Sequence, residues 1–447
     1  MGGESSAEAF ARVERELLAR GYTRMVFDLG RIEALLDLLG SPQRAYPAIH
    51  VTGTNGKTTT ARMIDALLRA HGVRTGRYTS PHLETVRERI TIEDRPVSEA
   101  RFVEIYNEVA PVARFLDESN PEPLTYFDMT TAMAFAAFAD APVDVAVVEV
   151  GLGGADDSTN VLQAGVCVIT PIGLDHMEWL GDTVEEIALA KVGIVYKGAT
   201  LICAAQPPEA MRPILEHCAD VGATIAREGA EFGVLRRSVA VGGQVLTLQG
   251  LSGEYDEIYL PLHGAHQAQN AALALAAVEA FLGAGTEKAL NPETVREGFA
   301  AVTSPGRLER VRNSPPILLD AAHNPHGMAA TVAALAEEFS FRRLVAVVSV
   351  LADKDGRGML ELLEPLVDAV VVTRNTSPRS MPVAELAALA VEVFGSERVR
   401  VEPTMPDAID AAVTLAESDV DSAAGGVGVL ITGSVITVAD ARKLLKR

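Results

Sequence analysis

The chain has 447 residues, of which 48% are hydrophobic and 22% are charged, the proportions of an ordinary globular protein. This length exceeds what one hydrophobic core usually organises, so two or three domains are expected. The formal net charge of −21 argues against general attraction to nucleic acid or to anionic membranes, and it implies that anionic substrates meet locally placed cations or metal ions.

The first segment of the chain is predicted to be helical. Residues 1–20 are polar and charged with helical spacing, which is unlike a signal peptide. The pattern over residues 6–39 predicts two helices separated near Gly21. No apolar run in the sequence reaches the roughly 18 residues that a membrane span requires. We therefore expect no membrane anchor.

A strand, a loop and a helix follow over residues 49–60, Ile-His-Val-Thr-Gly-Thr-Asn-Gly-Lys-Thr-Thr-Thr. Backbone N–H groups at such a helix N-terminus attract phosphate, with Lys57 as the cation for the outer phosphates and the Thr58 hydroxyl as a metal ligand. The general P-loop motif has glycine at the position of Val51, so the match is incomplete. The alternative is an ordinary glycine-rich turn.

Strands and helices alternate through the rest of the first 300 residues. The predicted elements are helices over 98–118, 127–139 and 267–282, strands over 89–93, 143–150, 165–170 and 200–204, and several short strands over 231–262. Alternation of this kind predicts an open parallel sheet with right-handed crossovers. The Gly-Gly and Ser-Gly turns within 231–262 predict a small antiparallel patch.

A second α/β region is predicted beyond residue 315. Residues 304–315 contain two prolines, a glycine and three arginines and are interpreted as a linker. Five strands then alternate with five helices, which predicts a compact Rossmann-like domain over 316–447. The predicted fold class is therefore α/β, with a P-loop-containing parallel-sheet ATPase domain over 1–303 and this smaller C-terminal domain.

Polar side chains stand at the carboxyl ends of predicted strands, where function collects in parallel sheets. Glu149 ends a buried apolar strand, where an unpaired carboxylate would be costly, so a cation is its natural partner. A structural salt bridge is the alternative. His176 and Ser80 follow other strand ends; taken alone, the first is more often a structural histidine and the second only a loop serine.

Three further residues stand out. Lys191 lies in an otherwise apolar segment, and a buried lysine amine can react with CO2 to form an acidic, metal-directed carbamate. The alternative is a lysine with a buried stem and a solvated head. Asp320 and His323 directly follow a strand of the second domain, where an Asx-Pro turn with incidental histidines is the alternative.

Taken together, these motifs resemble the Mur ligase superfamily and, within it, the folylpolyglutamate synthase/dihydrofolate synthase enzymes. The matching motifs lie in order over about residues 25–440 and are Gly53-Thr-Asn-Gly-Lys-Thr58, Ser80-Pro-His-Leu83, Glu149-Val-Gly-Leu-Gly-Gly154, Asp157-Ser-Thr-Asn160, Leu174-Asp-His176, Lys191-Val-Gly-Ile194, His266-Gln-Ala-Gln-Asn270, Ser304-Pro-Gly-Arg307, Asp320-Ala-Ala-His-Asn-Pro325, Asp353-Lys-Asp355 and Thr432-Gly-Ser434.

The resemblance implies a carbon–nitrogen ligase that uses ATP to join L-glutamate to dihydropteroate or to a reduced folate. The γ-phosphate would pass to the substrate carboxylate, and the glutamate amine would displace phosphate from the resulting acyl phosphate. The products would be dihydrofolate or folylpolyglutamates, with ADP and phosphate. Because such chemistry needs little covalent help from the protein, catalysis is mainly positioning and charge neutralisation.

The resemblance also implies roles for residues of this sequence. Lys57, Lys191 and His323 are the expected catalytic residues, and Lys191 is expected to be carbamylated. The expected ATP-binding residues are Thr54, Asn55, Gly56, Lys57, Thr58, Thr59, Asn270, Arg307 and Asp320. Two Mg2+ ions are expected, one beside Thr58, Ser80 and Glu149 and the other beside Glu149 and His176. A monovalent cation is a further candidate.

The site for the pteroyl substrate is implied by Thr125, Phe127 and Asp157. Phe127 would offer a stacking surface, and plain core packing is the alternative for this side chain. The sequence departs from the family pattern at three positions. Asp128 replaces the usual Glu, and two alanines stand where Arg and Glu are common, Ala155 and Ala190. These departures affect the substrate site and not the reaction class.

Two other functions stay open. One is a different Mur-type ligase, which would add an amino acid to a cell-wall nucleotide precursor; only 47 residues precede the strand that begins at Ala48, too few for an extra UDP-binding domain. The other is a P-loop ATPase module acting on a partner protein, which the Asp320–His323 motif and the linker arginine argue against.

The expected partners are small molecules only, without nucleic acid or membrane, and the protein is expected to be a monomer. The three cysteines have no metal-type spacing, and Cys167 and Cys203 lie in apolar runs, as buried free thiols do. A reducing cytoplasm is the expected location.

Overall fold

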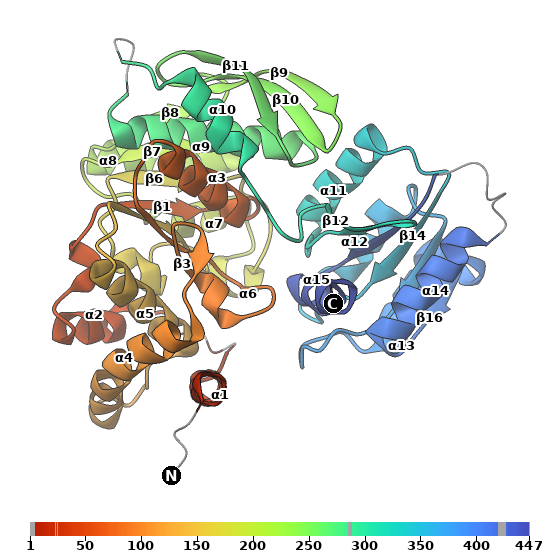
Figure 1. Cartoon of the computed structure of the whole chain (residues 1–447), viewed down its shortest axis with the longest axis horizontal. Coiled ribbons are helices and arrows are strands. Elements are labelled where there is room, and N and C mark those ends of the chain that lie inside the picture. The colour runs from red at the N-terminus through yellow and green to blue at the C-terminus, as the bar shows by residue number, and fades with distance from the viewer. Residues whose placement is uncertain (1–4, 23, 25, 285–287, 419–425, 447) are drawn as a thin grey trace. The chain divides into compact units, whose positions relative to one another are not determined.

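The computed structural model describes residues 5–22, 24, 26–284, 288–418 and 426–446 (Figure 1). The chain divides into two compact units. The first consists of Met1–Ser238, Val245–Leu260 and Ala268–Val302, and the second of Val239–Gln244, Pro261–Gln267 and Thr303–Arg447. Each unit has its own sheet and its own apolar core.

An eight-stranded sheet organises the first unit, in the order β4-β3-β2-β5-β1-β6-β7-β8. All neighbours from β2 to β8 are parallel, whereas β3 pairs antiparallel with β2 and β4. The central strands β1 and β5 are buried along their whole length, which explains their continuous apolar sequences. The strands are β1 (Ala48–Thr52), β2 (Thr75–Tyr78), β3 (Ile90–Ile92), β4 (Arg95–Pro96), β5 (Val145–Glu149), β6 (Val166–Ile169), β7 (Thr200–Cys203) and β8 (Thr224–Arg227).

The helices of this region follow the sequence pattern closely. Asp28, Ser98 and Thr125 cap the helices α2, α4 and α5 by accepting backbone N–H groups, which sets where these helices begin. The helices are α1 (Ser6–Leu18), α2 (Leu29–Leu38), α3 (Lys57–Ala70), α4 (Glu99–Ser119), α5 (Tyr126–Asp140), α6 (Met177–Leu180), α7 (Val184–Val192), α8 (Pro208–Val221), α9 (Ala265–Leu282) and α10 (Pro292–Ala300).

A separate three-stranded sheet, ordered β11-β10-β9, forms over the stretch predicted as a patch. Its strands are β9 (Gly233–Ala240), β10 (Gly243–Gln249) and β11 (Glu254–Leu260). Only two residues join β9 to β10, and a connection this short joins antiparallel strands. The predicted antiparallel patch is therefore present, with longer strands than the sequence indicated.

The second unit contains a six-stranded sheet in the order β12-β13-β17-β14-β15-β16, parallel except for the antiparallel edge strand β12. Residues 309–313, which were assigned to the linker, form this edge strand. The elements are β12 (Glu309–Asn313), β13 (Pro316–Leu319), α11 (Pro325–Glu338), β14 (Arg343–Val348), α12 (Gly356–Leu363), β15 (Ala369–Val372), α13 (Val383–Phe394), β16 (Val399–Val401), α14 (Met405–Glu417), β17 (Val427–Thr432) and α15 (Val435–Leu445).

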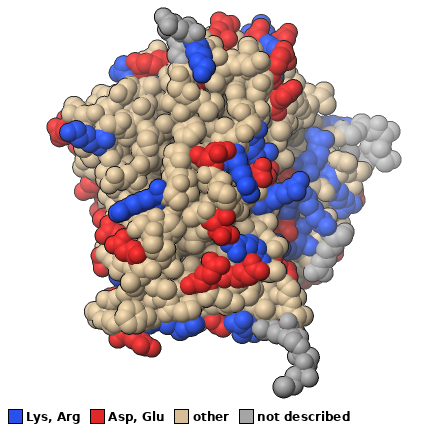
Figure 2. Space-filling view, turned by 60° about the vertical axis from the view of Figure 1, so that its left-hand side comes forward, with Lys and Arg blue, Asp and Glu red and all other residues tan. Residues whose placement is uncertain are grey.

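The predicted α/β class is confirmed by these two sheets. Cys167 and Cys203 are buried and free, as expected, and Cys218 is buried and free as well. Within the described ranges, no helix is long and apolar enough to cross a membrane. Figure 2 shows a face on which acidic and basic side chains are largely interspersed, so the excess of negative charge does not form a single-sign surface there.

Candidate functional site

The loop between β1 and α3 explains why glycine is needed at two positions. Gly53 and Gly56 have φ angles of +142° and +88°, which side chains disfavour. A Cβ atom on Gly53 would lie 1.9 Å from the Thr170 hydroxyl oxygen, and one on Gly56 would lie 2.6 Å from Asn270 Oδ1. The close approach at Gly56 places the buried side chain of Asn270, on α9, directly against the loop.

Not every amide of this loop is available to a phosphate. The N–H groups of Thr54 and Asn55 donate to the carbonyl oxygen of Pro171 at 3.0 and 3.4 Å. The Thr54 hydroxyl donates to the Gly173 carbonyl oxygen at 3.0 Å. The predicted phosphate contacts of the Thr54 and Asn55 amides are therefore not supported by these hydrogen bonds. The amides that begin α3 at Lys57 stay the predicted phosphate donors, because first-turn amides lack partners within their own helix.

Two lysines converge on the loop. Lys57 Nζ donates to the carbonyl oxygens of Gly53 and Thr54 at 3.1 and 3.2 Å, and Lys191 Nζ donates to that of Gly53 at 2.9 Å. Lys191 is only 4% exposed, so its head is not solvated as the alternative interpretation required. Burial, together with the neighbouring charge of Lys57, lowers the pKa of Lys191 to about 7.

Glu149 lies beside the start of α3. The pairing of β1 with β5 sets Glu149 opposite Val51, at the strand ends that lead into the loop. The Thr58 hydroxyl donates to the Glu149 carboxylate at 2.8 and 3.0 Å, and the Ser80 N–H donates to it at 3.2 Å. Glu149 is 1% exposed. The structure thus brings together the three residues predicted for the first metal.

The position of His176 does not decide whether it is a metal ligand. It precedes α6 with a φ of +52°, and its Nε2 lies 3.9 Å from Asp175 Oδ1. The charge of Asp175 also opposes the lowering of the Lys191 pKa, and the sequence interpretation gave Asp175 no role. Among the described residues, no group of three or more His, Cys, Asp or Glu is arranged to hold a metal ion. The second metal at Glu149 and His176 stays a prediction.

Two of the three departures from the family pattern are in contact. The Ala155 N–H donates to the carbonyl oxygen of Ala190 at 2.9 Å. The side chain of Asn160 joins the same two segments, because its Nδ2 donates to the carbonyl oxygens of Ala155 and Gly193 at 2.9 and 3.2 Å. The two alanines that depart from the expected pattern are therefore neighbours in the fold, joined by their backbones.

Thr125 and Asp128 form a capping box at the start of α5. The Thr125 N–H and hydroxyl donate to Asp128 Oδ2 at 2.8 and 2.9 Å. The Ser158 hydroxyl donates to Asp128 Oδ1 at 2.6 Å, and Arg31 pairs with Asp128 at 3.3 Å in a buried ion pair. Aspartate in place of the usual glutamate is therefore accommodated by local partners, and substrate binding by Thr125 stays a prediction.

The other two residues predicted to bind the pteroyl substrate, Asp157 and Phe127, also have contacts within the protein. Asp157 is buried, and it accepts the N–H groups of Leu152 and Thr159 at 2.8 and 3.0 Å. Burial raises the pKa of Asp157. A Cβ atom on Gly151 would lie 2.5 Å from Phe127 Cζ, so this ring has the packing contacts that the alternative interpretation predicts.

An exposed aromatic pair was missed by the sequence interpretation. The rings of Phe27 and Trp179 lie 5.6 Å apart and are 40% and 46% exposed. Trp179 lies in α6, next to His176, and Leu180 of the same helix would lie 3.0 Å from a Cβ atom on Gly153. The available signal was the single tryptophan of the chain, three residues after His176.

His50, on β1, contacts the turn that follows Asp157. We expect its protonation to reduce the free energy of unfolding of the first unit at acidic pH. Its Nε2 lies 2.8 Å from the Thr159 hydroxyl oxygen, and burial lowers the pKa of His50 to about 3. As the pH falls from 6.5 towards 3, the unfolded chain takes up a proton that the folded chain refuses, so stability falls.

We expect His50→Leu to lessen this acid sensitivity. Between pH 7 and pH 5 the free energy of unfolding of the variant should fall by about 2 kcal/mol less than that of the parent chain. Urea titrations at both pH values measure the difference. Equal losses in the two proteins would contradict the assignment of a neutral buried His50.

The predicted residues of the second unit lie where β13 ends. Asp320 accepts the N–H groups of Leu308 and Ala322, both at 3.0 Å, and the Thr331 hydroxyl at 2.7 Å. Asp320 therefore fixes the turn that contains Arg307, which precedes Leu308. His323 Nδ1 lies 3.1 Å from the carbonyl oxygen of Ala321.

An Asx-Pro turn is also present at this strand end. Asn324 Oδ1 accepts the Gly327 N–H at 2.8 Å, and Pro325 is the first residue of α11. The turn follows His323 directly and coexists with the predicted site residues, so the alternative interpretation of the motif does not exclude the functional one.

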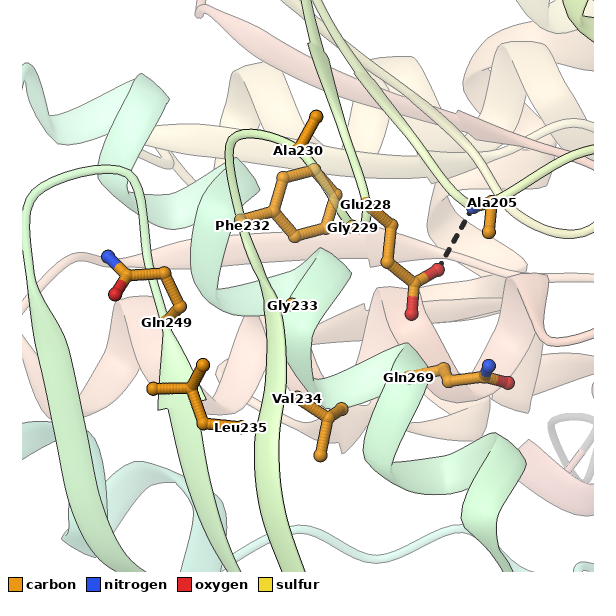
Figure 3. A pocket seen from close by; sticks show the side chains of 10 residues that line it. All are labelled: Ala205, Glu228, Gly229, Ala230, Phe232, Gly233, Val234, Leu235, Gln249 and Gln269. Carbon is orange, nitrogen blue, oxygen red and sulfur yellow. Dashed lines mark hydrogen bonds between the residues drawn. The ribbon is translucent and has the colours of Figure 1, made fainter.

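A cavity of about 490 Å3 lies in the first unit, at the carboxyl ends of β7 and β8 (Figure 3). Glu228 accepts the Ala205 N–H there at 3.0 Å, and Phe232, Val234 and Leu235 contribute apolar walls. None of the predicted site residues lines this cavity. Its nearest link to them in the chain is Gln269, the neighbour of Asn270 on α9.

Comparison with known proteins identifies both halves of the chain. Residues 51–278 match the Mur ligase middle domain, and residues 306–435 match the Mur ligase, glutamate ligase domain. The dihydrofolate synthase/folylpolyglutamate synthase of Mycobacterium tuberculosis is 52% identical over 444 residues, covering 95% of this chain and 91% of that protein.

Solved structures agree with these matches. Mycobacterium tuberculosis folylpolyglutamate synthase complexed with ADP has a TM-score of 0.95 at 52% identity, with 99% of both chains covered. The E. coli FolC in complex with DHPP and ADP has a TM-score of 0.84 at 29% identity, again with 99% of both chains covered. The chain therefore belongs to the Mur ligase family and, within it, to the dihydrofolate synthase/folylpolyglutamate synthases.

Proposed function

We propose that the chain joins the amino group of L-glutamate to the free carboxylate of dihydropteroate or of a reduced folate, with ATP cleaved to ADP and phosphate. One observation of the structure carries the proposal: the buried carboxylate of Glu149 accepts the Thr58 hydroxyl and the Ser80 N–H beside the start of α3, where we propose that phosphate binds. The 52% identity to the dihydrofolate synthase/folylpolyglutamate synthase supports the substrate class.

The proposed reaction has two steps. An oxygen of the pteroyl carboxylate attacks the γ-phosphorus and ADP leaves, which gives an acyl phosphate. The glutamate amine then attacks the acyl carbon, phosphate leaves, and the nitrogen loses a proton to yield the amide. Lys57 donates two of its three protons to loop carbonyls, so its remaining proton and its charge can serve the outer phosphates.

The oxygen donors beside the loop fit a magnesium ion. Mg2+ prefers carboxylate, hydroxyl, phosphate and water ligands, and Thr58, Ser80 and Glu149 offer the first two kinds. Bound there, Mg2+ would offset the negative charge of the phosphates. We also propose a second Mg2+ at Glu149 and His176 and leave a monovalent cation as a candidate without assigned residues.

We further propose that Lys191 carries a carbamate. Its amine would add to the carbon of CO2 and lose a proton, and the amine must be neutral to do so. The lowered pKa of Lys191, about 7 because of burial and the charge of Lys57, leaves a large neutral fraction at neutral pH. The resulting anion would lie beside the ammonium group of Lys57, which offsets its charge.

With carbon-labelled bicarbonate, the parent chain should therefore show a carbamate carbonyl signal in its NMR spectrum, and Lys191→Arg should lack it. Lys191→Arg should also lose most ligation activity, because a guanidinium is not carbamylated. The matched control is Lys197→Arg, at an exposed lysine six residues further on, which should keep both signal and activity. A parent chain without the signal, or a signal that survives in Lys191→Arg, would refute the modification.

The remaining assignments are proposals of the same kind. Arg307 and Asp320 would serve the nucleotide, and His323 would lie near the ATP phosphates and the incoming glutamate. Asn270 would also serve the nucleotide, from the side of the loop, which its contact with Gly56 supports. The division into 1–303, 304–315 and 316–447, a monomeric state and a cytoplasmic location complete the proposal. Small molecules alone are proposed as partners.

Phosphate release distinguishes the proposed ligase from the two alternatives. With ATP present, release should require both L-glutamate and a pteroyl substrate, and the pteroyl product should gain the mass of one glutamyl residue. A partner-dependent ATPase would release phosphate without either substrate, and a cell-wall ligase would require a UDP-linked acceptor. Either of these results would overturn the proposal.

A further inference from the structure

A buried arginine outside the predicted site occupies an unusual position. Arg89 is the last residue of the 3-10 helix Val86–Arg89, directly before β3, and it is 4% exposed. Its guanidinium carbon lies 5.2 Å from the ring centroid of Tyr126 and 5.8 Å from that of Tyr22. Nη2 also donates to the Tyr22 hydroxyl at 3.3 Å. The charge is thus held against two aromatic rings.

Arg89 binds the loop that carries Ser80 on both sides of that residue. Its carbonyl oxygen accepts the Thr79 N–H at 3.1 Å, and its Nε donates to His82 Nδ1 at 3.0 Å. A guanidinium only donates, so His82 Nδ1 accepts and the ring proton lies on Nε2. Between these two anchors the Ser80 N–H donates to Glu149 at 3.2 Å.

Arg89 also contacts the segment that contains two of the residues predicted to bind the pteroyl substrate, Thr125 and Phe127. Tyr126, which covers the guanidinium of Arg89, is the first residue of α5 and lies between Thr125 and Phe127. The Tyr22 and Tyr126 rings are in edge contact, with centroids 4.9 Å apart. One guanidinium therefore touches both the Ser80 loop and the start of α5.

We propose that Arg89 is a positioning residue that couples the pteroyl side of the site to Ser80 and thereby to the proposed metal beside Glu149. Arginine suits this role because its planar fork donates in two directions while its face lies on aromatic rings. Lysine offers a single charged point and cannot do both. The inference rests on the proposed function, because Ser80 and Thr125 take their roles from it.

The test is a comparison of Arg89→Lys with the parent chain in steady-state ligation. We expect the Mg2+ concentration for half-maximal rate and the KM for the pteroyl substrate each to rise about tenfold, the usual scale for residues that orient metal ligands. The KM for L-glutamate should stay unchanged. A structural defect alone would lower the amount of active enzyme without shifting these constants selectively.

Arg87→Lys is the matched control. Arg87 belongs to the same 3-10 helix, stacks on Phe10 with its guanidinium carbon 5.7 Å from the ring centroid, and donates to the Val97 carbonyl oxygen at 3.1 Å. These partners lie outside the Thr79–His82 loop. Equal shifts in Arg87→Lys and Arg89→Lys, or unshifted constants in Arg89→Lys, would overturn the inference.

His82→Phe provides a second route if Arg89→Lys does not fold. It removes the acceptor for Arg89 Nε and keeps the arginine and its tyrosine contacts. We expect His82→Phe alone to raise the Mg2+ concentration for half-maximal rate, and an unchanged Mg2+ requirement in this variant would refute coupling through His82. A parent chain that does not ligate glutamate would instead refute the proposed function itself.

Discussion

Lys57→Met is expected to lower kcat/KM for glutamate ligation by about a thousandfold, or ~4 kcal/mol of transition-state stabilisation. The ammonium group of Lys57 lies over the loop, with Nζ 3.1 Å from the Gly53 carbonyl oxygen. It is the side-chain cation proposed to meet negative charge as the γ-phosphate leaves ADP. Methionine approximates the apolar stem of lysine and removes the ammonium group, with its charge and its hydrogen bonds to the Gly53 and Thr54 carbonyl oxygens.

The measurement is ligation rate with saturating ATP, supported by a thermal unfolding scan. Lys57 is only partly buried, so the unfolding midpoint should change little. Lys57→Arg is a useful companion, because it keeps the charge and loses the compact shape. Near-normal turnover in Lys57→Met would remove the basis for assigning the outer phosphates to this residue.

Glu149→Gln is expected to cause a loss of similar size, about a thousandfold, for a different reason. Glutamine keeps the shape and an acceptor for the Thr58 hydroxyl, which lies 2.8 Å from the carboxylate. It removes the negative charge that a divalent cation needs. The residual activity should therefore lose its dependence on Mg2+ concentration.

The same substitution should not destabilise the fold. Glu149 is 1% exposed, and an amide is less costly to bury than a carboxylate. Mg2+ titrations of activity, paired with urea unfolding, separate the two effects. A Glu149→Gln variant that is unfolded, or one that keeps the Mg2+ dependence of the parent chain, would contradict the role given to this carboxylate.

Much of the fold is readable from local sequence because its strands are continuous apolar runs and its turns contain glycine. The strand Val145–Glu149 and the Gly53–Gly56 loop are examples. The assignment of residues 239–244 and 261–267 to the second unit is not readable in this way. It depends on distant partners: Gln244 Nε2 donates to the Leu262 and Gly264 carbonyl oxygens at 2.9 and 3.1 Å, and the Gly264 N–H donates to Glu338 of α11 at 2.7 Å.

The candidate site likewise has contacts that the sequence predicts and contacts that it does not. The meeting of Glu149 with Thr58 follows from the rule that parallel strands end at one edge, so the sequence could predict it. The contact network of Arg89 could not be predicted, because it depends on contacts between segments far apart in the chain. The pairing of Ala155 with Ala190 was hidden for the same reason.

Transfer of a heavy-oxygen label from the pteroyl carboxylate to phosphate tests both the ligase activity and its acyl-phosphate route. The substrate carboxylate is labelled, and the reaction is run with ATP and L-glutamate. Each amide bond formed should leave one labelled oxygen in the released phosphate, because the carboxylate oxygen attacks phosphorus and departs with it. Unlabelled phosphate, or phosphate released without the pteroyl substrate, would contradict glutamate ligation by this chain through an acyl phosphate.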